Sequence, residues 1–587
     1  MRGRIWLVAV VSASLLSGTE FFPLAAVRPG LKGSGKTVFS GTRIEEFQVE
    51  ILGVLENVGP KQSLVLARLS GGPLDNAGVL QGMSGSPVYI EGKLLGAVAM
   101  AFPFAKEPVA AIRPIEELLR ASGPGKPSRR LAAAMWDGNL AKVFEGPQEV
   151  LAAGGRLVEI ATPVHFGGFT QATIEYFAPQ LRALGLEPRQ GIAGGSSRLA
   201  EMGDPSLLQP GAMITVQLLA GDMSLGADGT VTHIEGDKIY AFGHRFLSIG
   251  ATELPFARAE VLTVLPNLAS SFKISAAREW MGTITEDRST AVAGLLGRRA
   301  SMVPVSIEVR RRTAGGISAE SRYRMEMVRD RFLAPFLLQM VVYSAIDATE
   351  RMFGSATIGV AGEIRFHNGN EPLRLNNMYA GEFSLPQQVS LATVVPLAYA
   401  LQTADTLELK EVRLELDAYD QKKQMQIDQV WVRPRQVRPG EEVEVTVSLV
   451  SGSGLELTRK TSYRVPVGMP EGPLYFTVAD GATTNLSEYR QLLGGAPRSA
   501  AQLLQFLNSL RANTKAYVRV WRPQPSYQAG GEEFPSPPPS LAQILARGQT
   551  ALGLGGAGAG SKVAELEISA GDVVISGSKT VQVEVKE

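Results

Sequence analysis

The hexapeptide Gly82-Met83-Ser84-Gly85-Ser86-Pro87, here called the serine box, combines hydroxyl groups with glycines that let backbone amides gather beside them. A nucleophilic serine needs a reachable hydroxyl, a nearby base and N–H groups directed at the developing oxyanion. Gly82 lets the backbone turn without a Cβ atom, so its N–H can face the same cavity as that of Ser84. The serine box is therefore either an oxyanion hole built from backbone or a Gly-Ser turn without chemistry.

Of the two serines, Ser84 is the better candidate for the nucleophile. It lies in a GxSG pattern, and the glycine on its C-terminal side leaves room for a substrate. Ser86 is the rival within the box, and the proline after it directs the chain into the apolar segment PVYIEGKLLGAVAMAF. That segment predicts a hairpin that turns at residues 91–93.

The numbers of cysteine and histidine residues limit the kinds of catalytic and metal site that the chain can form. The chain has no cysteine, which excludes disulfides, thiolate catalysis and Cys-ligated zinc. Its four histidines are scattered, which argues against a multi-histidine metal site, and we expect neither a metal nor an organic cofactor. His244, in AFGHRF, is either a turn residue or a base. His233 falls in strand alternation, and His165 and His367 are expected in loops.

Two regions of the chain resemble the stage IV sporulation protein B (SpoIVB) family of serine peptidases. The stretch GVLQGMSGSPVYIEGKLLGAVAM resembles the family's serine box with its GK-hydrophobic-GAV hairpin, and more distantly the GDSGGP box of the trypsin-like clan. The stretches PGAMITVQL and GTVTHIEGDKIYAFGHRF are similar to the family segment that ends in a Gly-His pair. MGTITEDRSTAVAGLLG is similar to the segment that follows it.

The resemblance implies roles for three residues. Ser84 would be the nucleophile, His244 the general base, and the N–H groups of Gly82 and Ser84 the oxyanion donors. The serine box precedes the Gly-His segment here, whereas the sporulation peptidase has its histidine first. The halves of a two-barrel peptidase would therefore be swapped along the chain, which is allowed because geometry and not order defines a catalytic triad.

The acid that would orient the histidine is left open. The family is thought to place an acid shortly upstream of the serine, and Asp75, in PLDNAG, is the acidic residue between Glu56 and Ser84. Asp287, in TEDRS, and Asp237, just before the Gly-His strand, are alternatives. A site without any acid is the remaining possibility.

The elements that must position these residues are predicted to be mainly β with some α. The 63 glycines, 35 prolines and many β-branched runs favour strands with frequent turns. The resemblance implies a trypsin-like two-barrel unit built from two separated β half-domains, 27–122 and 210–300. A mixed α/β connector at 123–209 joins them, and a second mixed α/β region follows at 301–405.

Alternation predicts an immunoglobulin-like β-sandwich at 406–482. In EEVEVTVSLV, Val443, Val445, Val447 and Leu449 share one strand face. Residues 483–587 are expected to hold a helix with Ser499 as N-cap, the linker-like stretches EEFPSPPPS and GLGGAGAGS, and C-terminal strands. Phe332–Ile346 predicts a buried helix, and the arginines at 310–312 a solvated face.

The N-terminus resembles an export signal. Residues 1–26 contain Arg2 and Arg4 followed by the apolar run Ile5–Leu16. We expect a periplasmic or extracellular protein, with an uncleaved N-terminal anchor as the alternative and the only membrane contact. The net charge of +1 gives no reason to expect a nucleic-acid partner.

Two functions follow from these patterns. The first is an exported serine endopeptidase that cleaves a protein in the cell envelope through an acyl-enzyme. The second is a non-catalytic envelope scaffold or binding protein that retains a peptidase-like fold, because fold does not guarantee activity.

Overall fold

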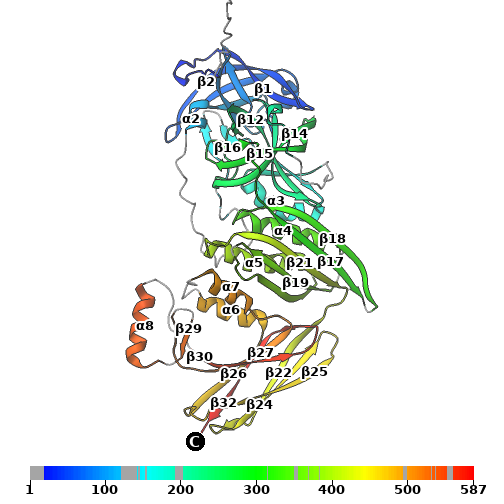
Figure 1. Ribbon diagram of the computed structural model, residues 1–587, viewed down its shortest axis with the longest axis vertical. Coiled ribbons are helices and arrows are strands. Elements are labelled where there is room, and N and C mark those ends of the chain that lie inside the picture. The colour runs from blue at the N-terminus through cyan, green and yellow to red at the C-terminus, as the bar shows by residue number, and fades with distance from the viewer. Residues whose placement is uncertain are drawn as a thin grey trace, which may run out of the picture.

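Strand-forming runs dominate the chain, and the computed structural model is mainly β with some helices, stacked along one long axis (Figure 1). This confirms the predicted structural class. The structure describes residues 19–120, 142, 144, 146–152, 155–191, 202–313, 315–349, 355–367, 369–382, 384–492, 499–529, 532–535, 537–551 and 560–587.

The N-terminal region forms a closed six-stranded antiparallel barrel, with strands paired in the order β1-β2-β3-β6-β5-β4 and β4 returning to β1. The β4–β5 hairpin turns at Glu91 and Gly92, whose φ angles of 51° and 77° suit a two-residue loop. This unit contains β1 (Lys32–Ser40), β2 (Arg43–Gly59), β3 (Gln62–Ser70), α1 (Leu74–Ala77), β4 (Pro87–Ile90), β5 (Lys93–Ala101), β6 (Val109–Pro114) and α2 (Ile115–Leu119).

The end of the predicted export signal packs against this first barrel. Residues 1–18 lie outside the described part of the chain. The amide of Phe22 donates to the carbonyl of Leu94 at 3.0 Å, and the Glu20 carboxylate pairs with the Lys93 ammonium at 2.9 Å. Residues 20–26 are thus part of the folded unit.

A second set of six strands pairs in a closed antiparallel circuit, in the order β11-β12-β13-β16-β15-β14 and back to β11. The strands are β11 (Met213–Gly221), β12 (Ser224–Glu235), β13 (Lys238–Ala241), β14 (Gly250–Leu265), β15 (Phe272–Asp287) and β16 (Val292–Leu296). Between the two circuits along the chain lie β7 (Glu149–Ala152), β8 (Gly155–Glu159), β9 (Thr162–Gly167), α3 (Gln171–Ala183) and β10 (Leu186–Gln190).

The sheet of the second circuit continues through β18, β17, β21, β19 and β20, with α4 and α5 packed against each other. α4 corresponds to the predicted buried helix. Among the helices of the described residues, none combines the length and the hydropathy of a membrane-spanning segment. The elements are β17 (Met302–Thr313), β18 (Gly316–Val328), α4 (Leu333–Thr349), β19 (Ala356–Phe366), β20 (Leu373–Gly381), α5 (Leu385–Thr403) and β21 (Leu409–Tyr419).

The C-terminal strands form a four-stranded and a five-stranded sheet that share one apolar core. These strands extend past the predicted limits of 406–482 to Val585, and β21 pairs instead with β17 and β19. The sheets contain β22 (Gln424–Arg433), β23 (Gln436–Val437), β24 (Glu442–Ser451), β25 (Glu456–Arg464), β26 (Gly472–Asp480), β27 (Lys515–Arg522), β30 (Ser561–Ser569), β31 (Val574–Ser576) and β32 (Ser578–Val585).

Shorter elements surround this pair of sheets: α6 (Gly481–Leu492), α7 (Ala500–Asn508), β28 (Ser526–Ala529), β29 (Glu532–Pro535) and α8 (Pro539–Ala551). Ser499 is the N-cap of α7, since its side chain accepts from the amide of Gln502, as predicted. The stretch EEFP, expected in a linker, forms β29. Most of GLGGAGAGS, residues 553–559, lies outside the described residues.

Candidate active site

The serine box links α1 to β4 through two tight turns in the first barrel. The amides of Met83 and Ser86 donate to the carbonyls of Leu80 and Met83 at 3.2 and 3.0 Å. Met83 is fully buried in the barrel core and anchors the loop. Within the described residues, the amides of Gly82 and Ser84 donate no hydrogen bond, so both remain able to act as oxyanion donors.

Strand β12 of the second circuit holds the backbone of the serine box. The Thr230 hydroxyl donates to the carbonyl of Gly82 and the Thr230 amide to the carbonyl of Ser84, both at 2.9 Å. The Thr232 hydroxyl donates to the carbonyl of Gly85 at 2.7 Å. Two β units that are far apart in the sequence therefore meet at the serine box.

Gly85 lies where two backbones approach too closely for any side chain. Its φ is 92°, and a Cβ atom there would lie 2.1 Å from the carbonyl oxygen of Thr230 and 2.6 Å from the amide nitrogen of Phe242. Phe242 and Gly243 immediately precede His244. The structure thus brings the serine box against the loop that carries the predicted base.

The loop between β13 and β14 holds His244 in a defined tautomer. Phe242 is fully buried with a φ of 68°, a strained conformation for a bulky residue. The Nδ1 atom of His244 lies 2.6 Å from the carbonyl oxygen of Arg245. Because a carbonyl can only accept, Nδ1 carries the proton and Nε2 carries the lone pair, as a general base requires.

Burial lowers the pKa of His244, against the opposing influence of the Glu159 carboxylate and the bond to Arg245. The ring is therefore neutral at neutral pH. Ser84 Oγ and His244 Nε2 are both buried, and neither has a hydrogen-bond partner among the described residues, so they are not bonded to each other. Such orphaned polar atoms are rare in proteins and call for an explanation.

Asp287 supports the His244 loop and does not contact its ring through a hydrogen bond. The carboxylate, at the end of β15, accepts from the amides of Phe246, Leu247 and Ile249 at 2.8, 2.7 and 3.1 Å. Burial raises the pKa of Asp287 to about 6, although these three amides favour the charged form. Asp287 is therefore placed to hold the shape of the loop.

The other two predicted acids have local structural contacts. Asp75 lies in α1, where its carboxylate accepts from the amide of Gly71 at 2.8 Å in an exposed turn. Asp237 lies in the β12–β13 turn, and its carbonyl accepts from the amide of Leu296 at 2.8 Å. Neither carboxylate forms a hydrogen bond with His244 among the described residues.

Glu159 is a carboxylate near His244 that the sequence patterns did not single out. It lies at the end of β8, is 7% exposed, and its Oε1 atom has no partner within the described structure. Its Oε2 atom lies 3.5 Å from Arg245 Nε and accepts from the amide of Gln148 at 2.9 Å. Arg113, fully buried in β6, donates to the carbonyl of Gly243 at 3.2 Å. A signal existed, since Glu159 interrupts the apolar run of LVEIA.

Ser86 is engaged in a buried polar chain behind the serine box. Its hydroxyl donates to Thr37 Oγ1 at 3.1 Å, and the Lys273 ammonium donates to the same oxygen at 2.7 Å. Burial lowers the pKa of Lys273 to about 7, with the nearby Asp228 carboxylate opposing. Because Ser86 is already bonded, the geometry favours Ser84 as the serine with a free hydroxyl.

His165 lies in strand β9 and not in the expected loop. Its Nε2 atom lies 2.8 Å from Asp228 Oδ2, and Asp228 also accepts from the hydroxyl of Thr215 at 2.6 Å and from that of Ser275. The expectation failed because β9 joins the sheet through β10 and β12, pairings that a local pattern does not reveal.

A groove of about 260 Å³ opens beside the serine box. Its lining includes Gly78, Val79 and Gln81, which precede the box, and residues 101–105 at the end of β5 and beyond it. Glu159, whose carboxylate opposes the lowering of the His244 pKa, lies in the lining of this groove. Two of its lining residues, Phe104 and Leu268, are 80% and 102% exposed.

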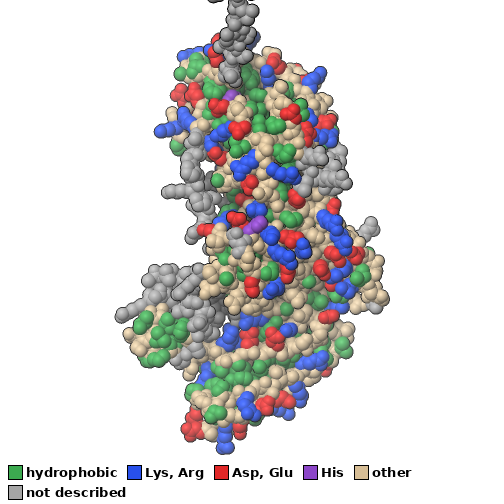
Figure 2. Space-filling view, viewed as in Figure 1, with side chains coloured by type: hydrophobic (Ala, Val, Ile, Leu, Met, Phe, Trp, Pro, Cys, Tyr) green, Lys and Arg blue, Asp and Glu red, His purple; other side chains and the backbone are tan. Residues whose placement is uncertain are grey.

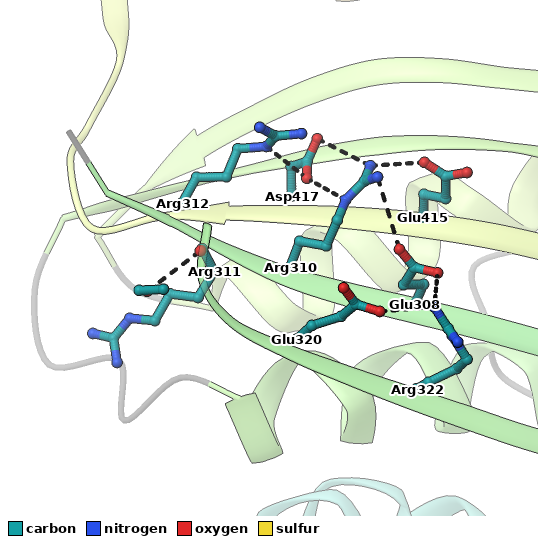
Figure 3. A network of polar contacts seen from close by, with 9 residues as sticks. Glu308, Arg310, Arg311, Arg312, Glu320, Arg322, Glu415 and Asp417 are labelled. Atoms are coloured by element: carbon teal, nitrogen blue, oxygen red, sulfur yellow. Dashed lines mark hydrogen bonds and ion pairs between the residues drawn. The ribbon is translucent and has the colours of Figure 1, made fainter. Parts of the chain in front are cut away.

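The arginine run at 310–312 is paired on the surface, in keeping with the solvated face expected from the sequence. Arg310 and Arg312 both contact Asp417 of β21, and Arg310 also reaches Glu415 (Figure 3). On the face shown in Figure 2, basic and acidic side chains are interspersed. These arginines carry no candidate site.

A scan against protein-family models matches residues 26–109 to the family described as SpoIVB peptidase S55. Searches of curated proteins and of solved structures gave no match. The matched residues include the whole serine box, whereas His244 lies outside them, and the resemblance predicted from the serine box is confirmed over this range. The chain therefore carries a SpoIVB peptidase S55 domain at residues 26–109.

Proposed function

We propose that this protein is an exported serine endopeptidase that cleaves a protein substrate of the cell envelope. The S55 peptidase domain supports a serine peptidase and a protein substrate. The two closed six-stranded circuits support a trypsin-like two-barrel unit whose halves are swapped along the chain. The two facing C-terminal sheets support an immunoglobulin-like sandwich.

In this proposal Ser84 Oγ attacks the scissile carbonyl carbon while His244 Nε2 accepts the hydroxyl proton. The N–H groups of Gly82 and Ser84 donate to the oxyanion of the tetrahedral intermediate. His244 then gives its proton to the leaving amine, and water hydrolyses the acyl-enzyme by the same steps in reverse. Asp287 acts as a positioning residue through the backbone amides of the His244 loop.

One observation carries the proposal. Ser84 Oγ and His244 Nε2 are both buried at the contact between the two circuits, and both lack a partner within the described structure. A buried unsatisfied polar atom costs about 1–3 kcal/mol, so a chain selected only for stability would replace or pair these groups. A reacting peptide supplies the missing partner.

Labelling with a fluorophosphonate probe, read by intact mass, tests this function. We expect one adduct on the wild-type protein, none on Ser84→Ala, and a labelling rate reduced about 10³-fold or more in His244→Ala. Ser86→Ala is the matched control and should label like the wild type. Labelling that persists in Ser84→Ala, or no labelling of any folded form, would favour the non-catalytic scaffold.

A further inference from the structure

A buried carboxylate, Glu159, approaches the His244 loop from strand β8. β8 pairs with β5, and the His244 loop touches the same strand, since a Cβ atom on Gly243 would lie 2.8 Å from the carbonyl oxygen of Val98. The Glu159 carboxylate lies 3.5 Å from the Nε atom of Arg245, the residue after His244. Strand β5 and Arg245 therefore bring Glu159 next to the loop that carries the proposed base.

The two oxygen atoms of this carboxylate have different surroundings. Oε2 accepts from the amide of Gln148 at 2.9 Å and faces Arg245. Oε1 is buried and has no hydrogen-bond partner among the described residues. A buried carboxylate costs free energy unless charged or hydrogen-bonding partners compensate it. Half of the Glu159 carboxylate is therefore left to act through its charge alone.

The acid of a Ser-His-Asp triad has two roles: it fixes the tautomer and orientation of the histidine, and it stabilises the imidazolium that forms. Here the carbonyl of Arg245, 2.6 Å from Nδ1 of His244, fixes the tautomer. A carbonyl group carries only a partial charge, however, and the Asp287 carboxylate is bonded to three backbone amides of the loop. The second role therefore calls for another carboxylate.

We propose that Glu159 fills this second role: its carboxylate stabilises His244 while the ring holds the proton taken from Ser84. Glu159 stays ionised throughout and receives no proton itself, so it is a positioning residue that acts through the ring. This inference rests on the proposed peptidase function. It adds the charge partner of the histidine, which the sequence patterns left open, and divides the work of the triad acid between a backbone carbonyl and a side chain.

The charges around the ring support this role. Burial lowers the pKa of His244, and the charge of Glu159 is the strongest influence in the opposite direction. The guanidinium groups of Arg113 and Arg245 both lower this pKa further. Asp287 lies on the backbone side of the same loop. Loss of the Glu159 charge would therefore leave two guanidinium groups acting on a buried ring that must become positive during the reaction.

Glu117 provides a matched control. It is 6% exposed, and its Oε2 atom lies 4.0 Å from Nη1 of Arg113, the arginine that also feels the charge of Glu159. Glu117 is not among the charges that act on His244. Glu117→Gln and Glu159→Gln thus remove the same charge from two buried carboxylates beside one arginine, and they differ in their action on the histidine.

NMR titration of the His244 ring tests the charge effect without relying on activity. The proteins carry Ser84→Ala and ¹³C-labelled histidine, and the His244 signal is the one that His244→Gln lacks. We expect the pKa of His244 to be lower in Glu159→Gln than in the parent protein, because a favourable charge is lost. In Glu117→Gln this pKa should be unchanged.

Fluorophosphonate labelling at pH 8 tests the consequence for the reaction. We expect Ser84 to be labelled about tenfold more slowly in Glu159→Gln, the change that corresponds to one pKa unit of lost stabilisation. Glu159→Asp keeps the charge and should recover part of the rate, and Glu117→Gln should be labelled at the wild-type rate. Circular dichroism and thermal melting establish that each variant is folded, and Glu159→Met is the second neutral variant if Glu159→Gln is not.

The outcomes separate the role of Glu159 from the peptidase function. If the pKa of His244 is the same in Glu159→Gln and Glu117→Gln, or if both variants are labelled equally slowly, Glu159 has only a structural role and the peptidase stands. A labelling rate that Glu159→Asp does not raise above that of Glu159→Gln also overturns the charge effect. If the pKa falls as expected but the probe labels no folded form at Ser84, the peptidase function is overturned instead.

Discussion

At the junction of the two six-stranded circuits, four polar side chains are buried, and each leaves an atom without a hydrogen-bond partner in the described structure: Ser84, Arg113, Glu159 and His244. The core between the two C-terminal sheets is built differently. Valine, leucine, isoleucine and phenylalanine fill most of it, and the hydroxyl of Tyr463 is its unpartnered polar atom within the described chain.

The difference separates a region that folding alone explains from one that the proposed reaction explains. Apolar side chains gain free energy by leaving water, so the core between the two C-terminal sheets is close to what folding alone would select. Buried polar atoms without partners cost free energy and persist mainly where function needs them. Variants at the two places should therefore have opposite consequences for stability and for Ser84 reactivity.

The largest expected effect on stability is in the core between the two C-terminal sheets. Phe476 is fully buried in β26, and Phe476→Ala should lower the free energy of unfolding by about 3–5 kcal/mol. Urea unfolding followed by tryptophan fluorescence measures the loss, and Trp521, which stacks on Tyr475 of β26, is one of the reporters. Ser84 labelling in native buffer should remain at the wild-type rate. A matching drop in labelling of the folded variant would contradict the separation of the two regions.

The next effect concerns the buried lysine behind the serine box. Burial lowers the pKa of Lys273 from 10.5 to about 7, so between these pH values the unfolded chain binds more protons than the folded one. Stability should therefore rise with pH across this window, by at most about 1.4 kcal/mol per pH unit. Urea unfolding at several pH values should show this rise in the wild type and its absence in Lys273→Met. If stability rises with pH equally steeply in Lys273→Met, the titration of Lys273 is not the cause of the rise.

Asp287 offers a smaller effect that reaches the reaction directly. Asp287→Asn should cost about 1–3 kcal/mol, because the new amide group faces backbone N–H donors. In Asp287→Asn, the fluorophosphonate probe should label Ser84 more slowly at pH 8 than in the wild type. The control Asp75→Asn changes a carboxylate in an exposed turn and should be labelled at the wild-type rate.

In the wild-type protein, the labelling rate should depend on Asp287 through pH as well. The pKa of Asp287 is raised to about 6, so its carboxylate protonates and loses acceptor capacity as the pH falls through that value. Labelling should decline there in the wild type, and Asp287→Asn should lack this step. An identical acid limb in both proteins would exclude Asp287 as the positioning residue.

The same comparison shows why sequence predicted some features and missed others. The alternation of Val443, Val445 and Val447 is local, and all three are buried as expected. The hairpin at Glu91 and Gly92 is also local. The pairing of β32 with β26, about 100 residues earlier, was not predicted, because it is a long-range contact without a local signature.

In the candidate site, too, residues with a local sequence signal were predicted, and residues brought in by long-range packing were not. The serine box could be found from its own residue types, and its resemblance to a peptidase family named a partner in His244. Glu159 and Lys273 could not be assigned to the site, because each belongs to it only through packing between distant strands. Their one local signal is a charge inside an apolar run, in LVEIA and FKIS. Such a charge predicts either an exposed edge or a buried polar partner, and only the fold decides.

The smallest effect is the sharpest test of the comparison, because it sets two serines of one loop against each other. Ser84 Oγ is buried without a partner, so Ser84→Ala removes an unsatisfied hydroxyl and should leave the free energy of unfolding unchanged or slightly raised. Ser86 Oγ bonds Thr37, and Ser86→Ala should lower stability by about 1 kcal/mol. Thermal melting measures both, while fluorophosphonate labelling should show the reverse order. If Ser84→Ala proves the more destabilising change, its hydroxyl has a structural partner, and the junction is a packed core and not a site held ready for a reaction.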